Sequence, residues 1–420
     1  MGCKLNQAEG FQFSSLLEEN GIAQLVSSDS PNADLVMING CAVTCQAEAK
    51  TRQAVSKVVK KFPGAKVLVS GCYAQHVPSE ASKLPGVDYI IGLDARQNLE
   101  WWQEDPQKLV IEVDTPLKIS PFNAVNRSGR SRPFVKIQDG CDKKCTYCVI
   151  PSIRGASRSL SSRDIVTAAE SYVNQGSDEI VLTGVRIGSW GRDLDPPSSL
   201  VDLIIDIRDS TEIRRIRLGS LEPWELNDGL ANLILTDDRV CSHMHVPLQH
   251  THPDVLRRMR RPPVEKVIRK IRDYMQRVPN LGIGTDVIVG FPGETDVEFE
   301  RLLRDLTENP FSYIHVFSYS PRPDTVAGKR TDMVETAVMK DRSRILLELD
   351  KEKRDEFRKL NVGTFADVIP DVGRKDSEFV SAVSDNYLKV KVKKSGFAAG
   401  KCVNVKLVMD KSNILSGSAV

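Results

Sequence analysis

The first third of the chain alternates short apolar runs with an amphipathic segment. Asp34–Ile38 and Lys66–Ser70 are apolar runs of the kind found in buried strands. Between them, Ala47–Phe62 has apolar residues at helical spacing and lysines near its end. Two buried strands joined by a helix form a parallel βαβ unit, so we expect a Rossmann-like parallel-sheet domain here.

The central region repeats a strand and a helix six times. Six runs have the length of buried strands: Phe134–Gln138, Glu179–Thr183, Arg214–Gly219, His243–Leu248, Thr285–Val289 and Tyr313–Tyr319. Helical periodicity lies between them, at Ser162–Gln175, Ser199–Asp209, Glu225–Leu235, Val264–Arg277 and Thr295–Glu308. A TIM barrel has eight such units, so six predict a partial (βα)6 TIM barrel that is open on one side.

The last part of the chain changes character twice. Val334–Leu360 is typical of one long charged helix. Four strand-like runs follow it and predict a small β-barrel: Ala366–Ile369, Phe379–Ser384, Leu388–Lys393 and Cys402–Met409. Upstream, Pro116–Pro133 is rich in Pro, Asn, Ser, Gly and Arg and indicates a linker. The chain is therefore predicted to be an α/β protein with domains at 1–115, 134–360 and 361–420 and a linker at 116–133.

Composition narrows the class of protein. Of the 420 residues, 40% are hydrophobic and 27% are charged, which is typical of a globular protein and excludes a disordered or collagen-like chain. The net charge of +2 means that any basic surface must be local. We find no apolar run of about 18 residues and no apolar signal region, and we expect a cytoplasmic protein that does not bind a membrane. Its nine cysteines are then expected to be thiols that serve metal binding or catalysis.

Three cysteines come directly after the first predicted barrel strand. Cys141, Cys145 and Cys148 have the spacing Cys-x3-Cys-x2-Cys. Loops that follow barrel strands lie at the mouth where active sites are built. Three thiolates hold three irons of a [4Fe–4S] cluster and leave the fourth iron open to another ligand. A zinc knuckle is the alternative, but it needs a fourth ligand, and no further Cys or His lies close by in the sequence.

This loop, with Tyr147 before its third cysteine, resembles the signature of radical S-adenosylmethionine (SAM) enzymes, whose fold is a partial barrel of six βα units. The resemblance implies that the open iron binds the amino and carboxylate groups of SAM. Reduction of the cluster then cleaves SAM to a 5′-deoxyadenosyl radical. Similarity to further motifs of that family implies cofactor contacts at Tyr147, Gly184, Ser220, Glu222 and Asp286. For Asp286, an inward polar group of the core is an equally good interpretation.

Three Gly-Cys pairs form a second pattern. Cys3, Cys41 and Cys72 each follow a glycine, and the last two lie between a predicted strand and a helix. Equivalent positions at the carboxyl ends of parallel strands converge, and helix N-termini favour thiolates. The pattern therefore predicts a second cluster of three cysteines. The alternative is that these are small buried residues that happen to follow glycine.

The residues around these pairs resemble the N-terminal domain of the methylthiotransferases, a branch of the radical SAM enzymes: Gly2–Gln7, Asn39–Thr44 and Ser70–Gln75. The resemblance covers nearly the whole chain. It implies that Cys3, Cys41 and Cys72 hold an auxiliary [4Fe–4S] cluster that handles sulfur, and that the small β-barrel is an RNA-binding TRAM domain. Members usually carry a strand before the first Gly-Cys pair, whereas Met1 precedes Gly2 here. Either the recorded start is late or Cys3 is poorly anchored.

Two further features depart from that family. Cys45 stands where asparagine is usual and is interpreted as a bystander thiol, with a spare cluster or redox contact as the alternative. His250 and His252 lie where a Ser-Gly-Ser type sequence is usual. A His-x-His pair is a possible metal site, but a variant loop near the cofactor is the better interpretation because no further ligand is in register.

Local charge indicates an RNA surface. Lys389, Lys391 and Lys393 alternate along a predicted strand and so share one face, which suits a phosphate backbone. A second basic group is the run Arg257, Arg258, Arg260 and Arg261. Charge runs are usually solvated surface, and it is the TRAM-like context that favours RNA binding.

Three local sequences, at 2–7, 182–185 and 188–191, are most similar to the methylthiotransferases that act on threonylcarbamoyl-bearing tRNA. This implies conversion of N6-threonylcarbamoyladenosine at position 37, next to the anticodon, to its 2-methylthio form. The implied cofactors are two [4Fe–4S] clusters and SAM, and the implied partners are the tRNA anticodon stem-loop, an electron donor such as flavodoxin and a sulfur donor. A cation near the barrel mouth is expected to favour the threonylcarbamoyl carboxylate, with Arg154, Arg186 and Arg322 as candidates.

Two alternatives remain open at this point. The nearest is a related methylthiotransferase that acts on isopentenyladenosine tRNA or on a ribosomal protein. The other, from a different class, is a non-catalytic iron–sulfur protein that binds RNA or senses redox state. Cleavage of SAM by the reduced protein separates the enzymes from the binder.

Overall fold

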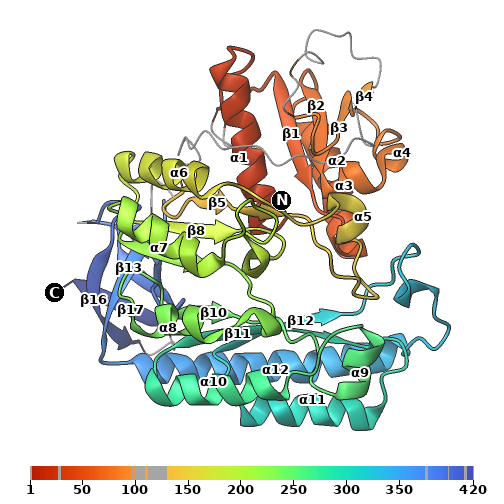
Figure 1. Cartoon of the computed structure of the whole chain (residues 1–420). Helices are drawn as coiled ribbons and strands as arrows, with labels where there is room; N and C mark the ends of the chain where they lie inside the picture. Colours follow the sequence, from red (N-terminus) through yellow and green to blue (C-terminus); the bar gives the residue numbers. More distant parts are fainter. Residues whose placement is uncertain are drawn as a thin grey trace.

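A parallel sheet with strand order β1-β2-β3-β4 forms the N-terminal part of the protein (Figure 1). The computed structural model describes residues 2–26, 30–96, 99, 109–111, 130–373, 377–395, 397–410 and 414–419. The strands are β1 (Leu35–Gly40), β2 (Lys66–Gly71), β3 (Tyr89–Ile91) and β4 (Leu109–Ile111). Helix α2 (Cys45–Lys61) connects β1 to β2, so the predicted βαβ unit is confirmed. Two short helices follow β2, α3 (Cys72–His76) and α4 (Pro78–Ala81).

Helix α1 (Lys4–Glu19) joins this sheet to the barrel, and the sequence pattern does not predict it. Its second half packs on the sheet, with Phe13 and Leu17 beside Leu68. Its first turns lie against the first barrel strand, where Glu9 pairs with Lys136 at 2.8 Å. The N-terminus of α1 therefore lies beside the barrel. Most of the predicted linker, 116–129, lies outside the described residues.

Six parallel strands form the open barrel, as predicted: β5 (Phe134–Lys136), β8 (Glu179–Thr183), β9 (Arg215–Leu218), β10 (His243–His245), β11 (Gly282–Val289) and β12 (Tyr313–Ser318). They make two three-stranded sheets, β5-β8-β9 and β10-β11-β12. Isolated bridges from Ile216 to Val240 and from Ser220 to His245 connect the two sheets. Strands β5 and β12 are thus the two outer members of the six-stranded wall.

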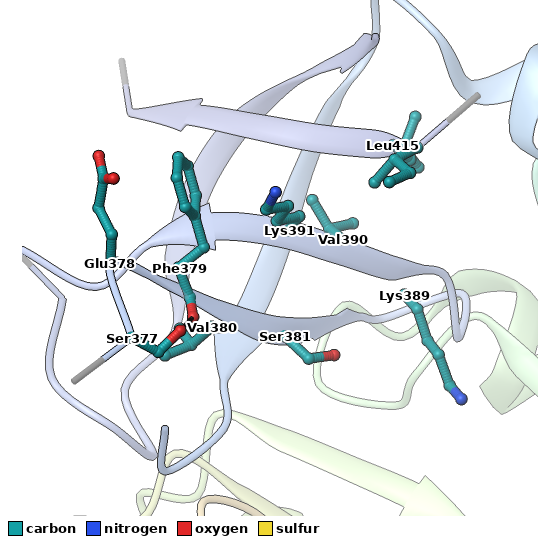
Figure 2. Close-up of a pocket in the computed structure, with 10 residues that line it drawn as sticks. Ser377, Glu378, Phe379, Val380, Ser381, Lys389, Val390, Lys391 and Leu415 are labelled. Atoms are coloured by element: carbon teal, nitrogen blue, oxygen red, sulfur yellow. Dashed lines mark hydrogen bonds between the residues drawn. The ribbon is translucent and has the colours of Figure 1, made fainter. Parts of the chain in front are cut away.

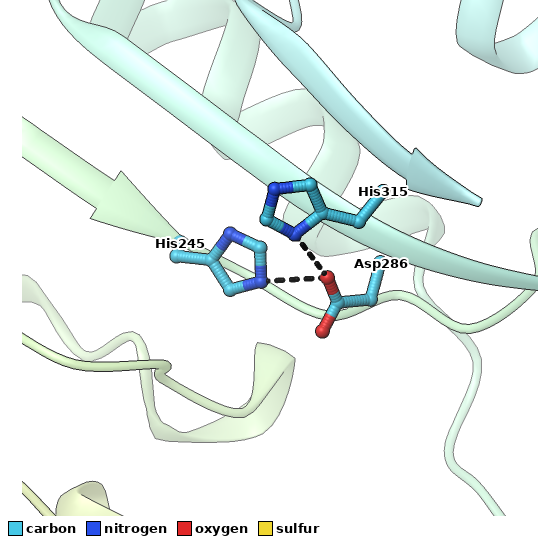
Figure 3. A group of neighbouring side chains, drawn as sticks. All are labelled: His245, Asp286 and His315. Atoms are coloured by element: carbon cyan, nitrogen blue, oxygen red, sulfur yellow. Dashed lines mark hydrogen bonds and ion pairs between the residues drawn. The ribbon is translucent and has the colours of Figure 1, made fainter. Parts of the chain in front are cut away.

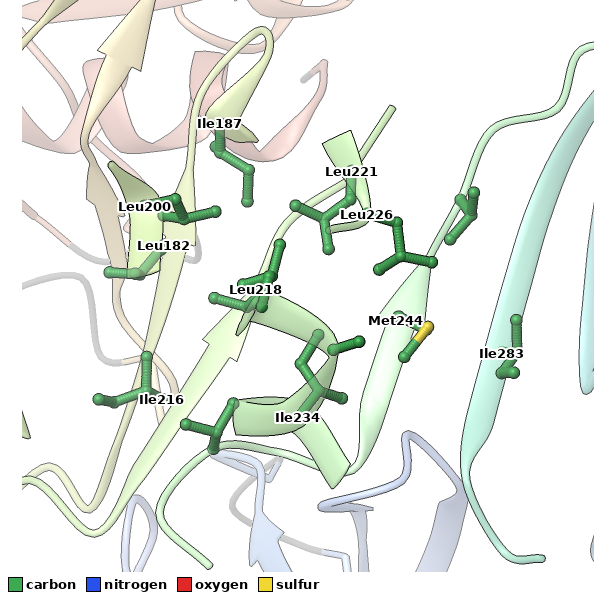
Figure 4. Packing of buried hydrophobic residues seen from close by; sticks show 14 of the residues in the cluster. Leu182, Ile187, Leu200, Ile216, Leu218, Leu221, Leu226, Ile234, Met244 and Ile283 are labelled. Atoms are coloured by element: carbon green, nitrogen blue, oxygen red, sulfur yellow. The ribbon is translucent and has the colours of Figure 1, made fainter. Parts of the chain in front are cut away.

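Helices cover the outside of this wall, and the six predicted ones agree with the structure within a few residues: α6 (Ser162–Asn174), α7 (Leu200–Ser210), α8 (Asp228–Thr236), α10 (Glu265–Arg277), α11 (Asp296–Glu308) and α12 (Thr336–Asn361). The apolar core lies between strands and helices, where Leu218 and Met244 pack with Ile234 (Figure 4). Short elements connect these units: β6 (Gln138–Asp139), α5 (Ile150–Arg154), β7 (Arg158–Ser159), η2 (Ile187–Ser189), η3 (Pro223–Glu225), α9 (Pro253–Arg258) and η4 (Ala327–Lys329).

The C-terminal strands close into a small barrel in the order β13-β14-β15-β17-β16. They are β13 (Phe365–Pro370), β14 (Phe379–Ser384), β15 (Lys389–Lys393), β16 (Val403–Met409) and β17 (Leu415–Ala419). The first four are predicted from the sequence, whereas β17 is not. On β15, Val390 and Val392 point into the core of the small barrel, and the lysines point outward.

The turn between β14 and β15 docks on the base of the large barrel. Arg217 donates hydrogen bonds to the carbonyl oxygens of Ser384 and Asp385, at 2.8 and 2.9 Å. Tyr387 in this turn has φ of 73°, a left-handed conformation that a tyrosine adopts only when its surroundings impose it. Its ring stacks on His243 with centroids 4.5 Å apart. The small barrel therefore closes the base of the lumen.

Across the described part of the chain, no helix combines the length and the apolar character needed to cross a membrane.

Candidate active site

The loop with Cys141, Cys145 and Cys148 is held in place by two distant segments. Between the second and third cysteines, the Thr146 amide donates to the Met259 carbonyl at 3.1 Å, and its carbonyl accepts from the Ala327 amide at 2.8 Å. These bonds fix the loop to the end of α9 and to η4, both of which follow barrel strands. Three thiols are therefore gathered at the mouth of the barrel.

The cysteines of this loop have the chemistry of a metal site. All three are free thiols. Burial raises the pKa of Cys148 to about 12 and also raises that of Cys141, with the neighbouring cysteines adding to both shifts. A metal displaces these protons on binding, because it is the thiolate that coordinates iron. Three half-buried thiols in one loop fit a [4Fe–4S] cluster with one iron open.

Four of the predicted cofactor contacts lie around this loop. Tyr147 packs edge-on against Phe291 with ring centroids 6.4 Å apart. Glu222 is paired with Arg261 at 2.6 Å. Ser220 is exposed at the end of β9. A Cβ atom at Gly184 would lie 2.7 Å from the carbonyl oxygen of Gln138, so only glycine fits there. Their contacts with SAM remain predictions.

Asp286, the fifth predicted contact, lies inside the barrel between two histidines (Figure 3). It accepts hydrogen bonds from His245 Nε2 at 2.9 Å and from His315 Nδ1 at 3.1 Å, across three adjacent strands. Burial opposes ionisation of Asp286, but these two bonds outweigh it and hold the pKa of the carboxyl well below its usual range. The structure thus favours the inward polar interpretation, and a contact with SAM stays untested.

The second set of cysteines meets at the edge of the N-terminal sheet. Cys41 follows β1, Cys72 begins α3, and Cys3 is the N-cap of α1. Burial raises the pKa of Cys72 to about 12, and the nearby thiols of Cys3 and Cys41 contribute to that rise. Asn6 anchors the start of α1 to the sheet, because its amide nitrogen donates to the Gly40 carbonyl at 2.8 Å. Cys3 is therefore held in place through α1.

Arg154 links the segment that follows the first set of cysteines to the second set. It ends α5, which starts two residues after Cys148, and its Nε lies 3.3 Å from the Cys72 sulfur. Its guanidinium also bonds Glu9 at 2.8 Å and Asp139 at 2.9 Å. Val149, the N-cap of α5, and Ile153 within α5 pack against Ala42 and Cys72 of the second site. The two three-cysteine sites are therefore neighbours.

The arginines that the sequence offers as carboxylate receptors already have acidic partners. Arg154 pairs with Glu9 and Asp139, and Arg186 pairs with Glu225 at 2.5 Å. Arg322 pairs with Glu48. The expectation that one of the three is free to bind a substrate is therefore not supported. The fold brings these acids from segments far away in the sequence.

Cys45 lies where the N-terminal sheet domain contacts the loop after β12. Its amide donates to Ser320 Oγ at 3.1 Å, and Arg322 Nη1 lies 3.5 Å from its sulfur. The thiol is exposed and lies in this contact. The geometry gives it a place between domains and leaves its chemical role a prediction.

The two histidines of the variant loop are engaged within the fold. His250 is fully buried, and burial lowers its pKa to about 3. His252 caps α9 by accepting from the Asp254 amide at 3.2 Å. In the following arginine run, Arg258 pairs with Glu298 at 2.7 Å. The ligand atoms of His252, Asp254 and Glu298 also lie within 4.8 Å of one another, so the variant-loop interpretation stays a prediction beside that of a metal site.

The small barrel presents the three predicted lysines on one face. Lys389, Lys391 and Lys393 are exposed and alternate with buried valines. Lys391 Nζ lies 4.4 Å from the centroid of the Phe379 ring, and both residues line a surface pocket that extends to Leu415 (Figure 2). Proteins that bind single-stranded nucleic acids combine lysines, which contact phosphates, with aromatic rings, on which bases stack.

An open (βα)6 barrel with a Cys-x3-Cys-x2-Cys loop at its mouth defines a radical SAM enzyme. The pattern of the Radical SAM superfamily matches residues 135–306, and that of Uncharacterized protein family UPF0004 matches residues 1–92. The structure is similar to that of the radical S-adenosylmethionine methyltransferase TsrM from Kitasatospora setae, which was solved with cobalamin and a [4Fe–4S] cluster bound. The TM-score is 0.52 and the sequence identity 14%, and the match covers 75% of this chain and 66% of TsrM. This similarity supports the fold.

Curated relatives define the family more narrowly. The chain is 32% identical to the threonylcarbamoyladenosine tRNA methylthiotransferase MtaB of Bacillus subtilis (strain 168), over 97% of this chain and 92% of that protein. It is 34% identical to MtaB of Thermotoga maritima, over 86% of this chain and 83% of that protein. It is also 32% identical to the tRNA-2-methylthio-N(6)-dimethylallyladenosine synthase of Helicobacter pylori (strain G27), over 86% and 84%. The chain belongs to the radical SAM methylthiotransferase family, and it is a tRNA-modifying enzyme that uses [4Fe–4S] clusters and SAM.

Proposed function

We propose that this enzyme converts N6-threonylcarbamoyladenosine at position 37 of tRNA to its 2-methylthio form. The observation that carries the proposal is the contact of Cys72 with the segment that directly follows Cys148, through Val149, Ile153 and Arg154, because a reaction that needs both a radical and a sulfur source requires the two sites close together. The names of the MtaB relatives favour the threonylcarbamoyl substrate. The dimethylallyl relative makes isopentenyladenosine tRNA the rival substrate.

The two sites have separate roles in this proposal. Cys141, Cys145 and Cys148 hold the cluster that binds SAM, and Cys3, Cys41 and Cys72 hold the auxiliary cluster. With these groups bound, one SAM would supply the 5′-deoxyadenosyl radical, a second SAM would supply the methyl group, and the auxiliary site would supply the sulfur that C2 of the adenine receives. The protein contributes thiolate ligands at both sites, the packing of Val149, Ile153 and Arg154 against Cys72, and a barrel lumen that receives the unstacked base.

The domains divide the remaining tasks. A Rossmann-like unit at 1–115 carries the auxiliary site, the core at 134–360 binds SAM through Tyr147, Gly184, Ser220 and Glu222, and the TRAM-like barrel at 361–420 binds the anticodon stem-loop. An electron donor such as flavodoxin reduces the clusters, and a separate sulfur donor replaces the sulfur that is consumed. Because the substrate is tRNA, we place the reaction in the cytoplasm.

Competition between two tRNAs tests the substrate. We expect reconstituted enzyme, given equal amounts of threonylcarbamoyl-bearing and isopentenyl-bearing tRNA under anaerobic conditions, to methylthiolate the first almost exclusively. Mass spectrometry of the digested nucleosides measures both products. A dominant isopentenyl product would assign the enzyme to the rival branch. Cleavage of SAM without formation of either product would mean that the enzyme catalyses a different reaction of the radical SAM superfamily.

Lys389, Lys391 and Lys393 changed together to Gln should weaken tRNA binding about 10- to 100-fold at low salt, because three phosphate contacts are lost. The slope of log Kd against log salt should fall by about two to three. Cleavage of SAM without tRNA should not change, since β15 belongs to the small barrel, which docks on the base of the large one, whereas the loop with Cys141, Cys145 and Cys148 follows β6 at the barrel mouth.

The matched control removes three exposed lysines from α2, at Lys50, Lys57 and Lys60, and keeps the overall charge change the same. Equal losses of affinity in both variants would show a general charge effect and argue against the TRAM-like surface. Deletion of the whole small barrel is a poorer test, because its β14–β15 turn closes the base of the lumen.

A further inference from the structure

We propose that Lys4 selects the substrate, because its ammonium group pairs with the carboxylate of the threonylcarbamoyl group inside the barrel lumen. The inference rests on the function proposed above. It adds the residue that separates a charged N6 substituent from an apolar one, and it assigns a carboxylate-binding site to the lumen.

The wall formed by β10, β11 and β12 is open to a ligand. On β12, Ile314 and Val316 pack outward on the hydrophobic core, so Tyr313, His315 and Phe317 face the lumen. The His315 side chain is 47% exposed and Phe317 is 44% exposed, although both lie on the inner face of the wall. Solvent, and hence a substituent on a base, reaches this part of the lumen.

The floor of the lumen is a stack of rings with Lys4 above it. Tyr387 stacks on His243, and the Tyr313 hydroxyl bonds both His243 Nε2 at 2.9 Å and His245 Nδ1 at 3.1 Å. The Lys4 ammonium lies 5.6 Å from the centroid of the Tyr387 ring. Although its backbone begins α1, the Lys4 side chain therefore carries its charge to the base of the lumen.

Lys4 differs from the arginines at this floor because, among the described residues, its ammonium forms no ion pair, although Glu179 lies close enough to act on it. Arg215 and Arg217 both bind Glu179, at 2.6 and 2.7 Å, and they give other donors to carbonyl oxygens of the small barrel. Within the ranges that the structure describes, the Lys4 ammonium makes a cation–π contact and neither a hydrogen bond nor an ion pair. Two guanidinium groups against one carboxylate leave excess positive charge here, and Lys4 adds to it.

The surroundings of Lys4 favour an anionic ligand. The Lys4 ammonium lies over the Tyr387 ring, at the floor where Arg215 and Arg217 face the single carboxylate of Glu179. A desolvated charge is stabilised chiefly by a counter-charge, so a carboxylate is worth more here than beside an exposed lysine. The acid on the facing wall, Asp286, is already bonded to His245 and His315 and does not occupy Lys4.

The place of Lys4 in the chain suits the chemistry of the base. C2, which receives the methylthio group, and C6, which carries the threonylcarbamoyl nitrogen, both adjoin N1 of the adenine ring. Lys4 directly follows Cys3, so the sulfur site and the ammonium belong to the same helix N-terminus. In the proposed binding mode, a base that presents C2 to the auxiliary site turns its N6 substituent toward Lys4. An apolar isopentenyl group would leave the ammonium desolvated without a partner, which disfavours that substrate.

Esterification of the substrate and substitution of Lys4 test the same contact from its two sides. The substrates are anticodon stem-loops that carry threonylcarbamoyladenosine, its methyl ester or isopentenyladenosine. With the wild-type holoenzyme we expect kcat/KM to fall about 10- to 100-fold on esterification, mainly through KM. For Lys4→Met, kcat/KM with the free acid should fall by the same factor, and kcat/KM should be equal for the acid and its methyl ester. Lys4→Arg should keep part of the preference for the acid over the ester. Fluorescence polarisation measures binding independently of turnover.

Controls keep the result specific to Lys4. Lys50→Met removes an exposed lysine of α2 and should behave as wild type. Iron content and SAM cleavage without tRNA are measured in every variant, so that rates are compared per reconstituted active site. If that variant still discriminates acid from ester as the wild type does, the inference is wrong and the proposed function stands. If the wild type prefers the isopentenyl stem-loop, the proposed function itself fails. Lys4→Met could lose iron because Lys4 adjoins Cys3. In that case the binding of acid and ester to the wild-type protein is the test, and equal binding of the two overturns the inference.

Discussion

Cys145→Ala should reduce formation of 5′-deoxyadenosine to background, whereas Cys72→Ala should retain this cleavage and lose methylthiolation. The physical reason is that the two residues belong to separate sites, at the barrel mouth and at the sheet edge, joined by Arg154 and α5. Two cubane clusters contain about eight irons, so each variant should keep about four. Iron analysis, chromatography of 5′-deoxyadenosine and mass spectrometry of tRNA nucleosides measure the three quantities.

Cys45→Ala is the matched control for these variants. Its thiol is exposed and contacts Arg322 and the loop after β12, outside both sets of three. We expect it to keep about eight irons and to form both products. Full methylthiolation by Cys72→Ala would remove that residue from the auxiliary site. A wild-type protein that never holds more than four irons would contradict the proposal of two clusters.

The sequence predicts the barrel well because its strands and helices are built from regular apolar spacing. Helix α1 escapes prediction for the opposite reason. Several of its buried positions are polar, including Asn6, Glu9 and Ser15, and tertiary partners such as Arg154 and Lys136 satisfy them. A pattern of apolar residues does not reveal a helix whose buried face mixes polar side chains with Leu5, Phe13 and Leu17. Strand β17, with the sequence Leu-Ser-Gly-Ser-Ala, lacks the apolar alternation that marks its neighbours.

The candidate site divides in the same way. The cysteines are recognisable because their spacing and flanking residues are local features of the sequence. The partners of the arginines are not local: Arg154, Arg186 and Arg322 appear free in sequence and fold against acids that are up to 274 residues away. Lys4 is visible in the sequence only as part of the Gly-Cys-Lys motif. Its approach to Tyr387 depends on how α1 and the small barrel meet at the lumen.

Glu179→Gln should destabilise the protein by about 3–5 kcal/mol, the second large effect that the structure predicts. The Glu179 carboxylate is fully buried and pairs with Arg215 and Arg217 at the junction of the two barrels. The neutral amide keeps the shape of the side chain but leaves two buried guanidinium groups without their counter-charge. Urea unfolding under anaerobic conditions at pH 7 measures the difference. The exposed Glu170→Gln, on α6, is the control and should change stability by less than about 0.5 kcal/mol.

The pH dependence of this effect separates charge from packing. Burial opposes ionisation of Glu179, but Arg215 and Arg217 outweigh it and lower its pKa to about 2. A depressed carboxyl pKa contributes stability that is fully present above the ordinary value near 4.5 and is lost only as the pH falls toward 2. The gap between wild type and Glu179→Gln should therefore stay constant from about pH 6 to pH 8. A gap that closes within this range would mean that Glu179 is not held ionised by the two arginines. A constant gap below about 1 kcal/mol would mean that carbonyl oxygens of the β14–β15 turn and of β13 suffice to satisfy both guanidinium groups.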